Sequence, residues 1–167
     1  MNTSVQEEKK STPKPRLMFA HSEEDCSGSA IRVELHPATL ERSGSLMLEF
    51  ADQTDPGYVD SDGYHNGGFN WAGSLKFRLK LAKVGKFLRL MNGDLSTSQP
   101  MQIPRKTDTV YLWCDRETDD SDADGVSILL TAIVDNTTER TFRLRPEEAE
   151  VLRLAIEGAM PKLAWGN

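Results

Sequence analysis

The chain has 167 residues, with 20 Lys or Arg and 26 Asp or Glu, so its net charge at pH 7 is −6. This length predicts one domain, or at most two small ones. The net charge excludes a protein held to nucleic acid by an overall excess of positive charge. The apolar runs are shorter than the roughly 18 residues that a membrane helix needs, and Cys26 and Cys114 have neither disulfide-framework nor metal spacing. We therefore expect a cytoplasmic protein.

Residues 1–16 are predicted to form a disordered tail. They combine charged residues and prolines with almost no apolar side chains. Such a segment buries too little apolar surface to offset the entropy lost on ordering. The globular domain is therefore expected to extend over residues 17–167.

The first half of this domain has the pattern of strands. Apolar and polar residues alternate over 31–35, 46–50 and 75–79, and a further strand is expected at 17–21. A period of two predicts a strand with one buried face and one solvent-exposed face. The stretch 51–70 is rich in Asp, Asn and Gly, which favour turns, and is predicted to be a long loop. Long loops of this kind are often functional.

A helix is expected next, over residues 81–91. Its apolar residues follow helical spacing, and Asn92 with Gly93 is expected to end it. Strands are then predicted at 109–113, 126–134 and 139–145. A second helix is expected to begin at Pro146, a favourable first helical residue. Pro161 is expected to end or kink this helix.

Two parts of the chain match each other. Residues 77–80 (FRLK) match 142–145 (FRLR), and 88–90 (LRL) match 152–154 (LRL). Each match lies where a strand runs into a helix. We interpret this as a duplicated β-β-β-β-α unit, with repeats at about 17–93 and 100–167; the alternative is that strand-to-helix junctions are simply alike. The expected fold class is α+β, with two antiparallel sheets and a helix after each, and a parallel doubly wound sheet is not expected.

This duplicated unit resembles the single-stranded-DNA-binding transcriptional regulator superfamily. That group includes the plant Whirly proteins and mitochondrial guide-RNA-binding proteins, and also eukaryotic transcriptional coactivators that build the same unit from two chains. Residues 28–37 (GSAIRVELHP) and 144–149 (LRPEEA) are also similar to a bacterial branch of the group. The chain has no match to the lysine-glycine-lysine-alanine-alanine motif of the plant proteins. The resemblance implies a Whirly-like fold over about 17–167, single-stranded nucleic-acid binding, transcriptional regulation and a homo-oligomer.

Positive charge is concentrated in one segment. Residues 72–92 contain six Lys or Arg and no Asp or Glu, although the whole chain is acidic. A row of cations at strand spacing can follow a phosphate backbone, and related rows in the two repeats would join into one track. The alternative is a solvated basic face balanced by nearby acids. The predicted phosphate-binding residues are Lys76, Arg78, Lys80, Lys83, Lys86, Arg143 and Arg145.

Single-strand binding also uses aromatic side chains, because bases stack on them at about 1–3 kcal/mol each. Tyr111 and Trp113 share one face of a predicted strand and are the main candidates. Further aromatic residues lie in or beside the 51–70 stretch at positions 58, 64, 69 and 71. The alternative for all of them is packing in the core. Trp165 is expected to anchor the end of the last helix on the core.

An acidic segment, residues 115–124, contains six Asp or Glu. It is interpreted as a polar hairpin loop or, alternatively, as a flap that competes with phosphates near the basic track. Residues 120–125 imitate the start of an EF-hand, but the twelfth position is Thr131 instead of the required Glu, so a calcium loop is rejected.

No catalytic constellation, cofactor motif or metal-ligand spacing is present in the sequence. We therefore expect a non-enzymatic protein without cofactor or metal that binds single-stranded DNA or RNA, with transcription or DNA maintenance as its setting. The alternative is a protein-interaction or oligomerisation module of the same fold that does not bind nucleic acid.

Overall fold

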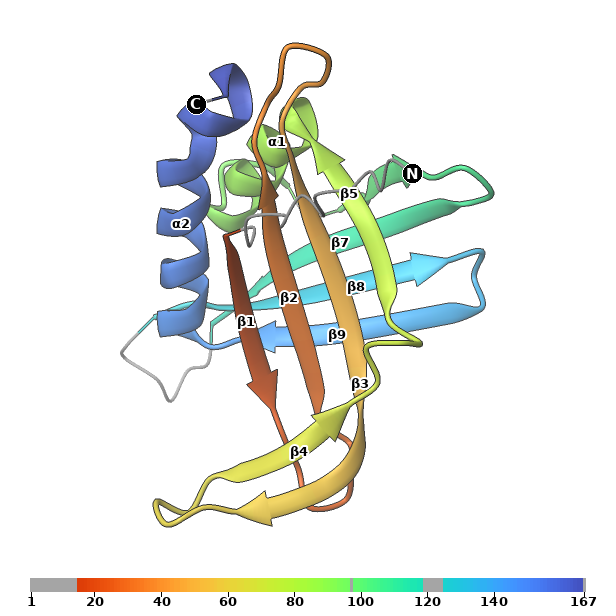
Figure 1. Ribbon diagram of the computed structural model, residues 1–167, viewed down its shortest axis with the longest axis vertical. Coiled ribbons are helices and arrows are strands. Elements are labelled where there is room, and N and C mark those ends of the chain that lie inside the picture. Colours follow the sequence, from red (N-terminus) through yellow and green to blue (C-terminus); the bar gives the residue numbers. More distant parts are fainter. Residues whose placement is uncertain (1–14, 97, 119–124, 167) are drawn as a thin grey trace, which may run out of the picture.

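The computed structural model describes residues 15–96, 98–118 and 125–166. It shows two antiparallel sheets, each followed by a helix (Figure 1). In chain order the elements are β1 (Arg16–His21), β2 (Ser29–His36), β3 (Ser45–Val59), β4 (His65–Phe69), β5 (Leu75–Lys80), α1 (Leu81–Met91), β6 (Met101–Pro104), β7 (Thr109–Glu117), β8 (Ser127–Val134), β9 (Thr138–Leu144) and α2 (Pro146–Trp165).

Each half of the chain forms one sheet. In the first sheet the strand order is β1-β2-β3-β5, and β4 pairs with the far end of β3. In the second sheet the order is β6-β7-β8-β9. The strands of the two sheets cross at a large angle, and α2 lies along one side of both (Figure 1). The predicted α+β fold of two antiparallel sheets, each followed by a helix, is confirmed, and β4 is an addition to the first half.

The inner faces of the two sheets share one core. In β5 the side chains of Leu75, Phe77 and Leu79 are buried, and in β9 those of Phe142 and Leu144 are buried. Successive strand side chains point to opposite faces, so the residues between them face outward. Each buried large apolar side chain stabilises the fold by about 1.5–3 kcal/mol. Phe77 and Phe142 occupy equivalent places in their halves, because each lies four residues before its helix.

Helix α1 ends where the sequence predicted. Asn92 is its C-cap, and Gly93 adopts a φ of 78°, a conformation that suits glycine. The N–H groups of Gly93 and Asp94 donate to the carbonyl oxygens of Leu90 and Arg89 at 3.0 and 2.8 Å. These bonds satisfy carbonyls that the last helical turn would otherwise leave unpaired.

The stretch 51–70 is not a loop, and this prediction was wrong. β3 continues to Val59 and β4 returns beside it, so residues 54–69 form a hairpin that projects from the body of the molecule (Figure 1). We call this segment the arm. Register shifts after Gln53 and Asp55, together with Gly57 at a φ of 62°, bend the hairpin away from the sheet. Its sequence shows no apolar alternation because neither of its faces packs on the core.

The base of the arm is fixed by one buried side chain, that of Gln53. Its Oε1 accepts hydrogen bonds from the N–H groups of Glu23 and Gly28 at 2.8 and 3.0 Å. Its Nε2 donates to the carbonyl oxygens of Glu23 and Asp55 at 2.9 and 2.8 Å. Gln53 therefore joins the start of the arm to the β1–β2 connection.

Helix α2 passes through Pro161, so of the two predicted outcomes, an end or a kink at this proline, the end does not occur. The last turn is stabilised by the start of β3, where the Gly44 N–H donates to the Leu163 carbonyl oxygen at 3.0 Å. A Cβ atom on Gly44 would lie 2.4 Å from that oxygen, so only glycine permits this approach. Leu163 is fully buried, and its packing offsets the hydrogen bond that the proline cannot donate.

Three smaller predictions, on the tail, the strands of the second sheet and Trp165, are corrected by the structure. Arg16 is not part of a tail, because it pairs with Glu34 in the first sheet. The strand Met101–Pro104 was not predicted, since four residues are too few to show alternation. Trp165 is 87% exposed and does not anchor the terminus, a role that Leu163 takes instead. The tail up to residue 14 and four acids of the segment 115–124 lie outside the described residues.

Candidate nucleic-acid interface

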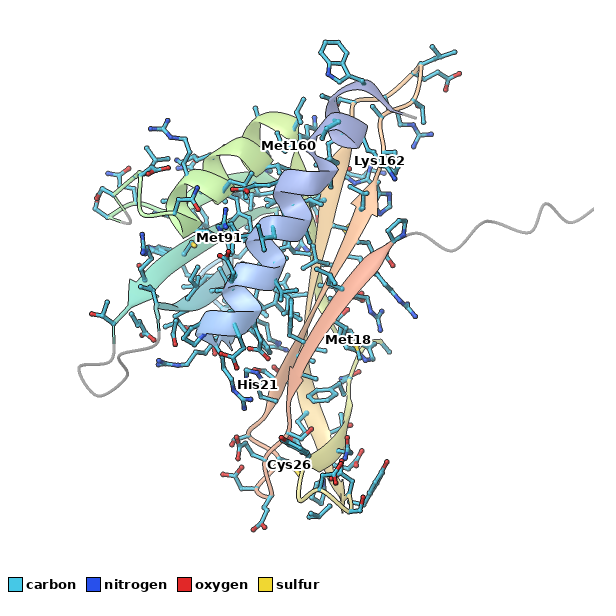
Figure 2. The ribbon with its side chains drawn as sticks, turned by 90° about the vertical axis from the view of Figure 1, so that its left-hand side faces the viewer. Met18, His21, Cys26, Met91, Met160 and Lys162 are labelled. Carbon is cyan, nitrogen blue, oxygen red and sulfur yellow. The ribbon has the colours of Figure 1, made fainter. Side chains whose placement is uncertain are left out.

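The two predicted rows of cations lie on opposite outer faces of the molecule. Lys76, Arg78 and Lys80 alternate with the core residues of β5, and Arg143 alternates with those of β9. The inner faces of both sheets meet in one core, so their outer faces point away from each other (Figure 2). The structure therefore does not bring these rows into one track within a single chain, contrary to the sequence-based hypothesis.

The outer face of the first sheet is positively charged. We call Lys76, Arg78 and Lys80 the basic row. Across the β3–β5 pair these residues lie opposite Glu49, Met47 and Ser45. Over β2, β5 and the part of β3 that precedes the arm, this face has two more cations than carboxylates. The cations are Arg32, Lys76, Arg78 and Lys80, and the carboxylates are Glu34 and Glu49.

Glu49 is a carboxylate that lies opposite Lys76 on the neighbouring strand, with only 5% of its side chain exposed. Its Oε1 accepts from the Ser74 hydroxyl at 2.7 Å and from the Lys76 ammonium at 3.1 Å, and its Oε2 accepts from Arg32 at 3.1 Å. Burial by itself raises the pKa of this carboxyl. The hydrogen bonds from Ser74 and Lys76 and the charges of Lys76 and Arg32 outweigh burial and lower the pKa below its usual value. Glu49 is thus ionised at neutral pH and partly neutralises two cations.

An aromatic ring covers part of the same face. The guanidinium carbon of Arg32 lies 3.9 Å from the ring centroid of Trp71. Arg32 comes from β2, and Trp71 comes from the connection between β4 and β5. A guanidinium at this distance is attracted to the electron-rich face of the indole. Glu49 also binds Arg32, so the ring lies over the same face of the first sheet that carries Lys76.

A groove lies along the free edge of β5, where Pro104 at the end of β6 and Arg105 of the β6–β7 turn approach this strand. Its cavity volume is about 460 Å³. The Arg105 Nη1 donates to the Lys76 carbonyl oxygen at 3.0 Å, which satisfies a backbone group of this edge strand. Arg105 also makes a bidentate pair with Asp108. We call this the edge groove; its lining residues are Met47, Lys76, Phe77, Arg78, Lys80, Pro104 and Arg105.

Two cations of the edge groove, Arg78 and Lys80, make no ion pair within the described part of the chain. Lys76 is 52% exposed but shares Glu49 with Arg32, and the charge of Arg105 is compensated by Asp108. Arg78 and Lys80 are therefore the strongest anion-binding groups on this face.

Lys83 and Lys86 do not extend the basic row. They belong to α1, which lies on the side of the first sheet that faces the second sheet (Figure 2). The buried side of α1 packs into the common core through residues that include Val84 and Phe87. The six cations that are continuous in sequence between 72 and 92 therefore separate into a strand group and a helix group.

The outer face of the second sheet is acidic. Tyr111 and Trp113 lie side by side there, with ring centroids 6.5 Å apart. Arg143 forms an ion pair with Glu117, and Asp115 and Glu139 share this face. Arg145 follows β9 and directly precedes α2. This face offers two half-buried aromatic rings but less positive charge than the first sheet.

Comparison with known proteins gives similarity only at the level of structure. No protein-family model matches the chain, and no curated protein matches it. The crystal structure of WHY1 from Arabidopsis thaliana is 17% identical, with a TM-score of 0.57, and the match covers 90% of this chain and 88% of that one. The chain has a Whirly-like fold.

Two further solved structures have the same Whirly-like fold. WHY3 from Arabidopsis thaliana is 15% identical, with a TM-score of 0.56, over 91% of this chain and 90% of that one. The plant transcriptional regulator PBF-2 is 19% identical, with a TM-score of 0.52, over 91% of this chain and 84% of that one. These structures come from plants, so the expected bacterial branch stays a prediction.

Within this Whirly-like fold, the described residues contain no group of three or more His, Cys, Asp or Glu side chains that could bind a metal ion. No helix in the described part of the chain is long and apolar enough to cross a membrane.

Sequence reasoning missed Arg32 and Arg105 in this Whirly-like fold. Arg32 lies between Ile31 and Val33 in a predicted strand, so alternation placed it on an outer face. Nothing local in the sequence joins it to Trp71 or to the basic row. Arg105 lies in a turn and reaches the edge of β5 only because the two sheets meet there.

Proposed function

We propose that this protein binds single-stranded nucleic acid, without catalysing a reaction, on the outer face of its first sheet. The observation that carries the proposal is the stacking of Arg32 on Trp71 beside the basic row. It combines an aromatic ring with exposed cations on one face of an otherwise acidic chain. Single-strand-binding proteins use the same combination of charge and aromatic surface.

The basic row has a geometry that suits a nucleic-acid backbone. Side chains on one face of a strand follow one another at about 7 Å, so Lys76, Arg78 and Lys80 offer regularly spaced positive charge along β5. Phosphates bind to such a row without regard to base sequence. Trp71 favours a single strand over a duplex, because only unpaired bases are free to stack on a side chain.

The other predicted site residues have secondary roles in this proposal. Tyr111, Trp113, Arg143 and Arg145 belong to the second sheet or to its end, and a strand bound to the first sheet of one chain does not reach them on the same side. They stay predictions for a longer strand that continues around the molecule. Lys83 and Lys86 of α1 also stay predictions, because they do not lie on the outer face of the first sheet.

The similarity to the transcriptional regulator PBF-2 supports transcription as the setting. The Whirly-like fold supports DNA as the ligand. Comparing the affinities for a DNA strand and an RNA strand of the same sequence would decide between DNA and RNA. The homo-oligomer implied by the resemblance is a further prediction, which sedimentation of the purified chain measures directly.

The test is fluorescence anisotropy with a labelled single strand of about 30 nucleotides at several salt concentrations, beside a duplex control. Each phosphate contact on a single strand contributes about −0.7 to the log–log salt slope. Replacing Arg78→Gln and Lys80→Gln together should therefore weaken binding and reduce the slope by about 1.4.

The matched control replaces Arg143→Gln and Arg145→Gln, which removes the same charge from the other side of the molecule. This control should change binding less than the Arg78 and Lys80 pair. A larger loss from the control would place the site on the second sheet. Absence of single-strand binding by the unaltered protein at low salt would reject the function.

A further inference from the structure

The arm exposes apolar surface that the fold itself does not use. Tyr58 and Tyr64 are each 68% exposed, and Val59 is 53% exposed. The arm also contains three aspartates and no lysine or arginine. Figure 1 shows it projecting beyond the two sheets. Exposed apolar groups that cluster on one projection, with charge of one sign around them, mark an interaction surface.

The turn of the arm is held in one conformation by Asp60. Its Oδ1 accepts from the N–H groups of Asp62 and Tyr64 at 3.0 and 2.9 Å, and its Oδ2 accepts from Asn66 at 2.9 Å. The bonds from Tyr64 and Asn66 outweigh desolvation and hold the pKa of Asp60 below its usual value. A pre-ordered turn loses little conformational freedom on binding, so the tyrosines are presented ready for contact.

The edge groove has the complementary chemistry. Met47 and Pro104 give it an apolar lining, and Arg78 and Lys80 contribute positive charge that no described carboxylate neutralises. An aromatic ring in this groove would contact the apolar walls and lie near a guanidinium or ammonium, an arrangement favoured by cation–π attraction. Carboxylates beside that ring would approach the same cations.

We propose that the arm of one copy docks into the edge groove of a second copy. The arm points away from the groove of its own chain, whose strand residues pair with positions 45–49 of β3 (Figure 1). Lys80 lies opposite Ser45, at the first residue of β3, whereas the arm begins beyond Gln53 at the other end of the same strand. The two surfaces are different parts of one chain, so the contact is heterologous and repeats from copy to copy into rings or chains.

The docked arm excludes a nucleic-acid strand from the groove. Tyrosine rings flanked by aspartates offer aromatic faces and negative charge, as unpaired bases with their phosphates do. Both ligands would use Arg78 and Lys80. This consequence rests on the proposed function, whereas the docking itself does not.

The first experiment measures self-association without nucleic acid, by sedimentation velocity of the full chain over a range of concentrations at low salt. One variant removes the arm contact (Tyr58→Ser with Tyr64→Ser), and a second reverses the groove charge (Arg78→Glu with Lys80→Glu). Each variant alone should weaken self-association by about tenfold or more. Trp165→Ser, which removes another exposed aromatic ring, should not.

Mixing the two variants gives the decisive result. The arm variant has an intact groove and the groove variant has an intact arm, so an equimolar mixture should form a complex that neither forms alone. Circular dichroism and thermal melting check that both variants are folded, and exposed substitutions of this kind usually change stability by less than about 0.5 kcal/mol. No complex on mixing, or unchanged association of either variant, would overturn the docking.

The same samples separate this inference from the proposed function. Adding a single strand of about 30 nucleotides should dissociate the assembly of the unaltered protein while the strand becomes bound. Self-association that behaves as expected together with no strand binding would keep the docking and reject the nucleic-acid function. Strand binding by the unaltered protein, together with self-association that the arm variant does not change, would keep the nucleic-acid function and reject the docking.

Discussion

Glu49 and Lys76 face each other across the β3–β5 pair, and the Oε1 of Glu49 lies 3.1 Å from the Nζ of Lys76. A nearly buried negative charge thus lies beside Lys76, one end of the basic row to which we assign nucleic-acid binding. The same carboxylate accepts from Arg32 and so orients the guanidinium that stacks on Trp71. Glu49 therefore fixes the geometry of the site and limits its positive charge.

Replacing Glu49→Gln should tighten single-strand binding, because Lys76 and Arg32 lose the charge that neutralises them. One additional phosphate contact would steepen the log–log salt slope by about 0.7. The same change should cost about 1–3 kcal/mol of unfolding free energy, since a buried hydrogen-bonding network loses part of its acceptors. Anisotropy titrations and urea unfolding measure the two effects. Glu139→Gln on the second sheet is the control, and equal tightening by this variant would contradict the assignment.

The contribution of Glu49 to stability should disappear in acid. The pKa of its carboxyl is lowered in the folded chain, so the unfolded state takes up a proton at a higher pH than the folded state does. The stabilisation is complete above the usual Glu pKa of about 4.3 and is lost as the pH falls through the folded value. Urea unfolding of the unaltered protein and of Glu49→Gln from pH 7 to about pH 3 should show their difference shrinking. A constant difference would contradict the pKa direction.

Trp71→Leu should weaken binding without changing the salt slope, because it removes stacking surface and no charge. The expected loss is about 1–3 kcal/mol of binding free energy if one base stacks on the ring. Trp165→Leu is the matched control, since Trp165 is 87% exposed and lies at the end of α2. If both variants bound as tightly as the unaltered protein, the stacking role of Trp71 would be wrong.

Gln53→Leu should destabilise the base of the arm. It leaves backbone groups of Glu23, Gly28 and Asp55 without their buried partner, at a cost of about 1–3 kcal/mol in unfolding free energy. Hydrogen exchange should accelerate in the arm and in the β1–β2 connection more than in α2. Ser61→Ala in the exposed turn serves as the reference variant, and equal exchange in both variants would argue against this role of Gln53.

The two cysteines should differ in reactivity. Burial, and secondarily the charge of Asp115, raises the pKa of the Cys114 thiol to about 12, and thiols react as thiolates. Cys26 is partly exposed. Maleimide labelling followed by mass spectrometry should therefore add one label to the native chain and two to the unfolded chain. Rapid double labelling of the native protein would show that β7 opens readily.

The local pattern of the sequence was sufficient for most secondary structure and for the outward direction of many site residues. Alternation around Phe77 put Lys76 and Arg78 on a solvent face, and helical spacing with Asn92 and Gly93 gave the correct end of α1. Both properties depend on residues close together in the chain. The same reasoning failed for the arm, since a hairpin without a buried face has no alternation to show.

Which surfaces meet was decided only by the tertiary structure. The sequence by itself determined a duplicated α+β fold and a basic strand in an acidic chain. It did not determine that Arg143 points away from Lys76, or that Arg32, Glu49 and Trp71 gather from three separate segments. Alternation along a strand defines which of its sides is exposed to solvent. Strand register and the packing of one sheet on the other depend on contacts between residues far apart in the chain.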